Sequence, residues 1–238
     1  MENQTATIHA NLAKIRERIA RATERCGRAP EEITLVAVSK THPAEAIRAA
    51  YESGVRHFGE NRVQEWESKH PKAADLDATW HLVGHLQSNK ARRAAYLFRR
   101  VDSVDDLALA KKLHAAAEAE GKCLPVLIEV HMGGEETKSG VAEADLPTLA
   151  SSIAPFAHLE LLGLMAIPPF FDAPEQARPY FRKLRELRDA LTQRLSRPLP
   201  ILSMGMSHDF EIAIEEGATE IRIGTALFGS RPNTGGVG

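Results

Sequence analysis

Cysteine, aromatic side chains and net charge are all scarce in this sequence. The 238 residues include two cysteines, Cys26 and Cys123, and 5% aromatic residues, and 30 Lys plus Arg against 32 Asp plus Glu leave a formal charge of −2. Two cysteines this far apart, with no His or Cys at zinc-finger spacing, argue against a disulfide framework or a metal site, so we expect reduced thiols. The even charge balance argues against nucleic acid as a partner.

Long apolar runs are also missing. The longest nearly apolar stretch, Leu161 to Phe171, contains two prolines and is far shorter than the roughly 20 residues that cross a bilayer. The first residues place polar and charged side chains where a signal peptide has its apolar core. We therefore expect a cytoplasmic protein that does not enter a membrane. Its 43% hydrophobic and 26% charged residues are typical of an ordinary globular protein rather than a disordered one.

Strand-length apolar runs alternate with helical patterns along the chain. Expected strands cover residues 33–38, 55–58, 79–83, 100–102, 124–131, 159–166, 200–203 and 220–223. Each strand except the last precedes a segment with helical periodicity. Such strands pair in parallel, and eight of these units close most readily into a TIM-type (β/α)8 barrel. We predict one α/β barrel domain over residues 1–238, with a doubly wound open sheet as the alternative.

One helix stands before the first strand. It is expected over residues 5–26, where Gly27 and then Pro30 end the helical pattern. Its apolar residues recur at helical spacing: Ile8, Leu12, Ile15 and Ile19. Only residues 225–238 follow the last strand, too few for a full outer helix. We therefore predict that the helix over residues 5–26 covers the barrel closure, between the last strand and the first.

Function in a barrel of this kind sits at the carboxyl ends of the strands. Lys40 stands two residues after Val38, at the end of the first expected strand. Near an apolar core, burial disfavours the ammonium form, which frees the amine to attack a carbonyl and form a Schiff base. Position alone also allows a solvated loop lysine.

Two loops after the last two strands have the composition of phosphate-binding loops. The segment Ser203–Ser207, SMGMS, leads into a helix, and Gly224-Thr225 opens another. Hydroxyls, backbone N–H groups and the positive end of a helix suit a phosphate, and many barrels bind one here. Together with Lys40 these loops indicate a phosphorylated carbonyl compound. A Schiff-base aldolase acting on a sugar phosphate remains open at this point.

Arg222 distinguishes between these possibilities. It stands between two isoleucines that should face the outer helices, so its guanidinium should point into the barrel. A buried arginine needs an acceptor, which could be Glu60 or Asp102 in a structural salt bridge. The functional alternative is a hydrogen bond to a ring nitrogen that must stay unprotonated, which suits pyridoxal phosphate.

Several motifs at successive strand ends carry a family resemblance. In chain order they are VAVSKT (36–41), FGEN (58–61) with QE (64–65), WHLVGHLQSNK (80–90), KSG (138–140), GLMAIP (163–168), SMGMS (203–207) and RIGTA (222–226). In these segments the chain resembles the pyridoxal phosphate homeostasis proteins, single-domain relatives of the barrel half of alanine racemase. The resemblance covers roughly residues 33–229, about four fifths of the chain.

The resemblance implies a pyridoxal phosphate site in which Lys40 forms the Schiff base and Arg222 faces the pyridine nitrogen. The other cofactor-binding residues that it implies are Asn61 near the ring, Ser203, Ser207, Gly224 and Thr225 around the phosphate, and Met204 and Gly205 in the pocket wall. His81 and Gln87 would border the mouth of the site, with a satisfied core imidazole as the alternative for His81. Some relatives carry a second lysine at the position of His42, so a lysine relay is not expected here.

The implied chemistry favours a binding protein over an enzyme. Pyridoxal phosphate withdraws electrons best when its ring nitrogen is protonated, which the cation of Arg222 disfavours. The tyrosines Tyr51, Tyr96 and Tyr180 fall in expected helices away from the strand ends, so we expect no second base for racemisation and no catalytic residues. We predict reversible cofactor binding in pyridoxal phosphate homeostasis. A weak racemase, lyase or transaminase is the alternative, and a cofactor-free aldolase ranks third.

Further expectations concern partners. The protein partners would be pyridoxal phosphate-dependent enzymes or enzymes that salvage vitamin B6, and the chain would be a monomer. Lys138 is either an exposed lysine that reacts loosely with free aldehyde or a surface residue in charge balance.

Overall fold

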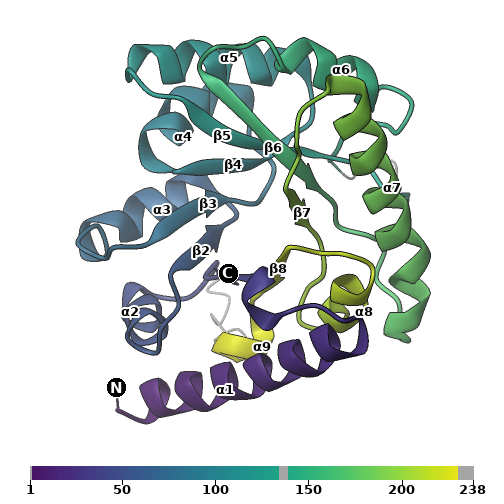
Figure 1. The fold of residues 1–238 in the computed structure, drawn as a ribbon. Helices are drawn as coiled ribbons and strands as arrows, with labels where there is room; N and C mark the ends of the chain where they lie inside the picture. The colour runs from purple at the N-terminus through teal and green to yellow at the C-terminus, as the bar shows by residue number, and fades with distance from the viewer. Residues whose placement is uncertain (1, 134–138, 230–238) are drawn as a thin grey trace, which may run out of the picture.

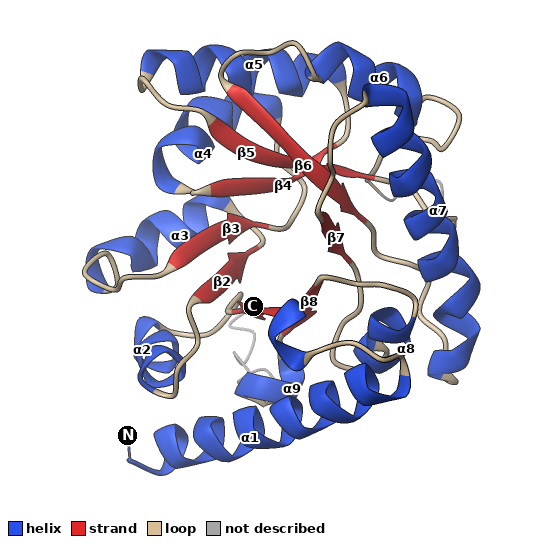
Figure 2. Cartoon of the chain, in the orientation of Figure 1, coloured by secondary structure: helices blue, strands red, loops and turns tan. Residues whose placement is uncertain are grey.

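Eight parallel strands close into a barrel in the computed structural model, which describes residues 2–133 and 139–229. The strand order follows the chain, and β8 pairs with β1 to complete the ring, with Val36 opposite Arg222. Helices surround this ring in Figures 1 and 2. The predicted (β/α)8 barrel is confirmed, and the open-sheet alternative is wrong.

The elements have the following bounds. The strands are β1 (Thr34–Val38), β2 (His57–Glu60), β3 (Thr79–Leu82), β4 (Arg100–Val104), β5 (Leu124–Glu129), β6 (Leu159–Met165), β7 (Ile201–Ser203) and β8 (Glu220–Ile223). The α-helices are α1 (Glu2–Arg25), α2 (Ala44–Glu52), α3 (Val63–Lys69), α4 (Ala91–Leu97), α5 (Leu107–Ala119), α6 (Leu146–Ile153), α7 (Arg178–Leu195), α8 (Phe210–Glu215) and α9 (Thr225–Phe228). Short 3-10 helices cover Pro30–Glu32, His70–Lys72, Ser88–Lys90 and Pro174–Ala177.

The second strand begins later than predicted. Val55, expected to open it, instead completes the end of α2: its N–H donates to the Ala50 carbonyl at 3.0 Å, and Gly54 has φ +100. This is the hydrogen bonding of a helix that ends on a left-handed glycine. The strand therefore starts at His57, after the chain has left this turn.

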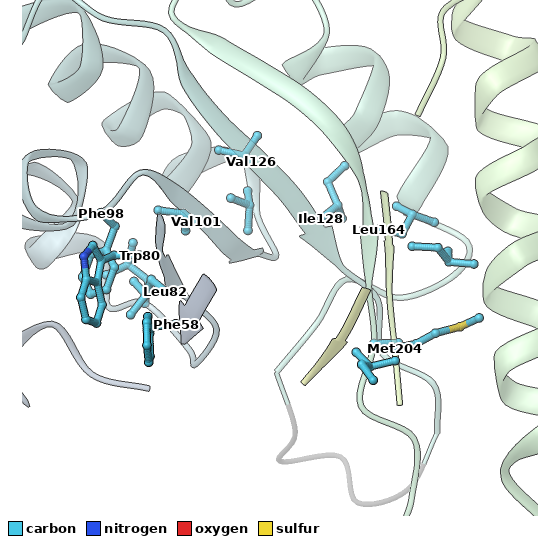
Figure 3. Packing of buried hydrophobic residues seen from close by; sticks show 14 of the residues in the cluster. Phe58, Trp80, Leu82, Phe98, Val101, Val126, Ile128, Leu164 and Met204 are labelled. Carbon is cyan, nitrogen blue, oxygen red and sulfur yellow. The ribbon is translucent and has the colours of Figure 1, made fainter. Parts of the chain in front are cut away.

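The apolar core lies between the barrel and its helices. Phe58 of β2 and Trp80 of β3, both labelled in Figure 3, stack with ring centroids 5.0 Å apart. Trp66 of α3 stacks on Trp80 at a centroid distance of 3.7 Å. Ile221 and Ile223 of β8 belong to the same core. Because side chains alternate along a strand, the residue between these isoleucines faces the barrel interior, as predicted.

The first helix packs against helices on both sides of the pairing between β8 and β1. It lies along α2, α8 and α9, which flank β1 and β8 (Figure 1). Ala22 and Thr23 are buried, together with the four apolar residues singled out in the sequence: Ile8, Leu12, Ile15 and Ile19. Asn11 Nδ2 donates to the Leu227 carbonyl at 3.0 Å, and Arg18 pairs with Glu211 of α8 at 2.8 Å. Within the described ranges, no helix has both the length and the apolar character that crossing a membrane requires.

Candidate functional site at the carboxyl end of the barrel

Lys40 lies in a turn at the carboxyl end of β1, with its side chain half-buried. Ser39, just before it, donates its hydroxyl to Glu60 Oε1 at 2.7 Å, and the N–H of Thr41, just after it, donates to Glu65 Oε1 at 2.5 Å. Thr41 has φ +66, a left-handed conformation that costs a residue other than glycine roughly 1–2 kcal/mol. Carboxylates therefore hold the residues on both sides of Lys40.

One nearly buried ammonium group organises these carboxylates. Lys69, the last residue of α3, donates to the Ser39 carbonyl at 2.9 Å, to Glu60 at 2.9 Å and to Glu65 at 2.8 Å. Burial raises the pKa of Glu60, with Lys69 acting against it. Burial alone would also raise the pKa of Glu65, but the hydrogen bonds from Lys69 and the Thr41 N–H outweigh it and lower that pKa. The last turn of α3 thus fixes the conformation of the Lys40 turn.

Arg222 points into the barrel from β8. It is 3% exposed, and its guanidinium donates from Nη1 to Ser203 Oγ and from Nη2 to the Ala166 carbonyl, both at 2.8 Å. Burial lowers its pKa, against the opposing effect of carboxylates farther away. The alternative of a structural salt bridge with Glu60 or Asp102 is wrong. Glu60 pairs with Lys69 and Asp102 with Arg100, and no carboxylate of the described residues lies within ion-pair distance of Arg222.

The next layer of the barrel interior balances this buried cation. Arg100 bonds to both oxygens of Asp102, at 2.6 and 2.9 Å, and to both oxygens of Glu220, at 2.7 and 2.5 Å. All three side chains are nearly or fully buried. Because one cation faces two carboxylates, the group carries one surplus negative charge. The surplus offsets the charge of Arg222, which sits two residues beyond Glu220 on β8. Arg222 can therefore stay charged without a carboxylate in direct contact.

The two predicted phosphate loops touch each other. The Ala226 N–H donates to Ser207 Oγ at 3.2 Å, and the Arg222 N–H donates to the Gly205 carbonyl at 3.0 Å. Gly205 has φ +90, and a Cβ at this position would lie 2.5 Å from the Cβ of Ala213. Both the backbone conformation and the space therefore require glycine here.

The loop after β8 lies against the end of β1. Gly224 precedes α9 and Thr225 begins it, and a Cβ on Gly224 would lie 3.5 Å from the carbonyl of Val38, two residues before Lys40. The carboxyl ends of β7, β8 and β1 therefore adjoin. The predicted site residues that they carry at this rim are Ser203, Ser207, Arg222, Gly224, Thr225 and Lys40.

Asn61 stands farther along the same rim, after β2, where it lines a cavity of about 530 Å3 together with Gln87. Its carbonyl approaches Gly84 so closely that a Cβ there would lie 2.4 Å away. Met204 has a different environment. Its side chain is completely buried in the apolar core (Figure 3), so only its backbone is available to the rim.

His81 does not border the mouth of this site, contrary to the expectation. It is 1% exposed inside the barrel, its Nε2 lies 3.1 Å from His57 Nδ1, and it lines a cavity formed by residues that begin β2, β4 and β5. Strand alternation turns His81 inward, but its register opposite Arg100 sets it at the level where β4 begins. Its Nδ1 has no hydrogen-bond partner among the described residues, so the imidazole is only half satisfied.

Tyr180 lies closer to the strand ends than predicted. Its ring centroid is 5.5 Å from that of Phe171, after β6, and its Cε1 lies 3.8 Å from a Cβ built on Gly133, after β5. The first turn of α7 stays at the rim because this helix runs back from the carboxyl end of β6. The expectation for the tyrosines is wrong for Tyr180, whereas Tyr51 and Tyr96 lie within α2 and α4.

The sequence also singled out His42 and Lys138. His42 is buried and stacks on Phe228 of α9 with centroids 4.9 Å apart, and burial lowers its pKa. It therefore packs the closure between β1 and α9. Lys138 lies outside the described residues.

Glu129 is a rim residue for which the sequence predicted no role. It ends β5, accepts a hydrogen bond from Ser139 Oγ at 2.9 Å, and has a raised pKa because it is buried. Its other oxygen has no hydrogen-bond partner among the residues described. A single acidic residue within the apolar run 124–131 was the available signal. No feature of the sequence indicated the role of Lys69, because that role depends on how α3 packs back against the end of β1.

Comparison with known proteins gives this arrangement a family. Residues 10–232 match the family described as alanine racemase, N-terminal domain. A pyridoxal phosphate homeostasis protein of Aquifex aeolicus is 48% identical over 220 residues, which cover 92% of this chain and 96% of that relative. The Escherichia coli protein of the same name is 45% identical over 230 residues, covering 94% and 97%. This chain belongs to the pyridoxal phosphate homeostasis protein family.

Solved structures agree with the family and the fold. PipY of Synechococcus elongatus, whose structure was determined with pyridoxal phosphate bound, superposes with a TM-score of 0.83 at 40% identity and covers 93% of this chain and 100% of its own. Alanine racemase of Corynebacterium glutamicum has a TM-score of 0.71 at 17% identity, covering 97% of this chain and 62% of the racemase. At that identity the racemase shares the fold alone. The family predicted from the motifs is confirmed.

Proposed function

We propose that this chain binds pyridoxal phosphate reversibly and serves in the intracellular homeostasis of the cofactor, without catalytic turnover. The observation that carries the proposal is the rim at the adjoining carboxyl ends of β1, β7 and β8. It combines an amine, a buried guanidinium and two hydroxyl-bearing loops. The homeostasis proteins of the family and the cofactor bound to PipY support the same function.

Each polar group of the rim fits one part of the cofactor. The amine of Lys40 suits the aldehyde, and the guanidinium of Arg222 suits the ring nitrogen. Hydroxyls and backbone N–H groups of the two linked loops suit the phosphate. The remaining groups of the proposed site are Ser203, Ser207, Gly224 and Thr225 at the phosphate, Asn61 beside the ring, and Gly205 with the backbone of Met204 in the wall.

Arg222 favours holding the cofactor over using it. When bound, pyridoxal phosphate supplies an aldehyde that condenses reversibly with amines and a ring that withdraws electrons when its nitrogen is protonated. Ser203 and the Ala166 carbonyl hold the Arg222 guanidinium in place, and a fixed cation beside the ring nitrogen disfavours its protonation. The chain's own groups thus bind and orient the cofactor while limiting its reactivity toward amino acids.

The decisive experiment uses the colour of the protein. Purified protein incubated with pyridoxal phosphate should absorb near the visible range, and borohydride reduction should leave one pyridoxyl group on the peptide that contains Lys40. Lys40→Ala should lose both properties, whereas Lys72→Ala, at an exposed lysine near α3, should keep them. A colourless wild-type protein that takes up no cofactor would contradict the proposal.

Tyr180 makes an enzymatic alternative testable. A phenol near the ends of β5 and β6 is a possible proton donor, so a weak racemase-like activity is the second candidate. Incubation of the loaded protein with L-amino acids in heavy water should show no deuterium at the α-carbon above a free-cofactor control. Exchange that disappears in Tyr180→Phe would replace the binding proposal with an enzyme.

The same proposal extends to partners. A reversible carrier in the cytoplasm would release its cofactor to pyridoxal phosphate-dependent enzymes or to enzymes of vitamin B6 salvage, and would act as a monomer. Release is tested by mixing the cofactor-loaded protein, in low-salt buffer, with an apo-enzyme and following the enzyme activity that is recovered. Sedimentation equilibrium tests whether the chain is a monomer.

A further inference from the structure

A second cavity lies at the opposite end of the barrel from Lys40. Its volume is about 760 Å3, and it opens where β2, β3, β4 and β5 begin. Sites for small organic ligands commonly have volumes of roughly 300–1,000 Å3. The amino end of a barrel ordinarily contributes to stability alone, so a cavity of this size there requires an explanation.

Cations predominate at the cavity entrance. Arg56, Arg99 and Lys122 line it, against one carboxylate, Asp77. Arg99 is exposed, and its guanidinium has no hydrogen-bond or ion-pair partner in the described ranges. Burial and the neighbouring Arg99 both lower the pKa of Lys122, whose ammonium donates, among the residues that the structure describes, only to the Ala95 carbonyl. An anion between these two like charges would relieve their repulsion.

The inner wall holds a polar pair that is incompletely satisfied. His81 lines the cavity. Its Nδ1 makes no hydrogen bond among the described residues and lies 3.8 Å from Asp102 Oδ2, and its Nε2 is engaged by His57, which also lines the cavity. Arg100 also lines the cavity, and its Nε and Nη2 are engaged by Asp102 and Glu220. A buried polar atom without a partner is uncommon in native proteins and often marks a ligand or ordered water.

Part of the cavity lining is apolar. Leu124 and Pro125 at the start of β5 and Leu162 of β6 contribute it. The cavity therefore presents both cations and an apolar surface to a ligand. The entrance carries three cationic side chains against one anionic one, which matches the double negative charge of a phosphate group.

We propose that this cavity binds a small phosphate monoester, with its phosphate between Arg99 and Lys122 and its apolar body against Leu124, Pro125 and Leu162. This site is separate from the rim that carries Lys40 and does not depend on the function proposed for that rim. It gives the chain a second ligand that binds through the amino face of the barrel.

Cys123 provides a reporter inside the cavity. Its side chain is exposed and belongs to the cavity lining, whereas the half-buried Cys26 follows α1 and donates to the Ala22 carbonyl. Alkylation of both thiols by iodoacetamide, followed by mass spectrometry, compares the two sites in one sample. Phenyl phosphate at about ten times its Kd should slow the alkylation of Cys123 about tenfold by mass action and leave Cys26 unchanged.

Three matched ligands separate the parts of the proposal. Inorganic phosphate should protect Cys123 only at higher concentration than phenyl phosphate, because it lacks the apolar body. Benzyl alcohol, which lacks the charge, and sodium chloride at equal ionic strength should give no protection. Equal protection by sodium chloride, or equal slowing of Cys26, would overturn the proposal.

Variants locate the binding site. Arg99→Gln should weaken the protection by phenyl phosphate about tenfold, since one charged hydrogen bond is lost. Arg21→Gln, at an exposed arginine of α1, should leave it unchanged. In Lys40→Ala, phenyl phosphate should still protect Cys123 fully, because the two sites lie at opposite ends of the barrel. Loss of protection in Lys40→Ala, or its retention in Arg99→Gln, would contradict the proposal, whereas the colour of the loaded protein tests the rim separately.

Discussion

At the scale of single residues, burial decides which charges this barrel tolerates. Arg222 stays charged because its guanidinium has two acceptors and a surplus of negative charge one layer away. For His81 the compensation is too small: Asp102 Oδ2 lies 3.8 Å from its Nδ1 and acts to raise its pKa, but opposing effects outweigh it. Burial is the largest effect and Arg100 adds to it, so the pKa of His81 is lowered to about 3. The imidazole is therefore neutral in the folded protein at neutral pH.

The protonation of His81 predicts a loss of stability in acid. Its pKa is lower in the folded state than in the unfolded state, so the unfolded chain binds the additional proton as the pH falls from 6.5 toward 3. Between pH 7 and pH 5 this group should remove about 2 kcal/mol from the free energy of unfolding. Urea unfolding at both pH values should show a loss larger by this amount in the wild type than in His81→Gln.

A matched control separates His81 from other titrating groups. His9→Gln, at an exposed histidine of α1, should lose as much stability between the two pH values as the wild type. The raised pKa values of Glu60 and Glu129 act in the opposite direction above about pH 4.5, but they are common to all three proteins. Equal losses in the wild type and His81→Gln would show that the imidazole is protonated in the folded state.

At the scale of elements, the site depends on a helix that carries none of its ligand-binding groups. The last turn of α3 brings Lys69 under the Lys40 turn, where it bonds to Ser39 and to the two carboxylates that hold this turn. The strained φ of Thr41 persists because the Thr41 N–H is fixed to Glu65. Lys69 is therefore a positioning residue for Lys40.

Removing this ammonium should loosen the Lys40 turn. Lys69→Met should weaken pyridoxal phosphate binding about tenfold, because the turn must be ordered on binding at a cost of about 1.4 kcal/mol. Absorbance titration measures the affinity, and the wavelength of the bound cofactor should shift as the environment of the lysine changes. Lys69→Arg, which retains the cation, should recover part of the affinity.

Lys72→Met is the control for this prediction, since Lys72 is 68% exposed and lies three residues away. It should bind the cofactor as the wild type does. A Lys69→Met protein that loses stability but keeps its affinity and spectrum would show that Lys69 stabilises the fold without positioning Lys40.

At the scale of the whole molecule, the barrel interior is a polar network inside an apolar shell. The shell comes from the outward faces of the strands and the inner faces of the helices, and Figure 3 shows part of it. The interior holds Arg100, Asp102 and Glu220 from β4 and β8, which lie on opposite sides of the ring. These ionic contacts connect distant strands across the barrel axis.

Breaking this network should destabilise the entire barrel. Arg100→Met leaves Asp102 and Glu220 buried together without a cation, so the free energy of unfolding should fall by about 3–5 kcal/mol. Urea denaturation measures the change. Arg92→Met, at an exposed arginine of α4, should change it by less than about 0.5 kcal/mol. Adding Asp102→Asn to Arg100→Met should recover part of the loss, and a further loss would contradict the role of Arg100 as a shared partner.

The sequence by itself determined the barrel and the family, because these depend on local patterns. Strand periodicity, helix spacing and strand-end motifs are properties of neighbouring residues. Only the tertiary structure decided which side chains meet. Lys69 of α3, Glu60 of β2 and Lys40 after β1 come from separate elements, and His81 faces the amino end because of strand register rather than its neighbours in the chain. Contacts between distant elements depend on how the ring closes, which no short segment encodes.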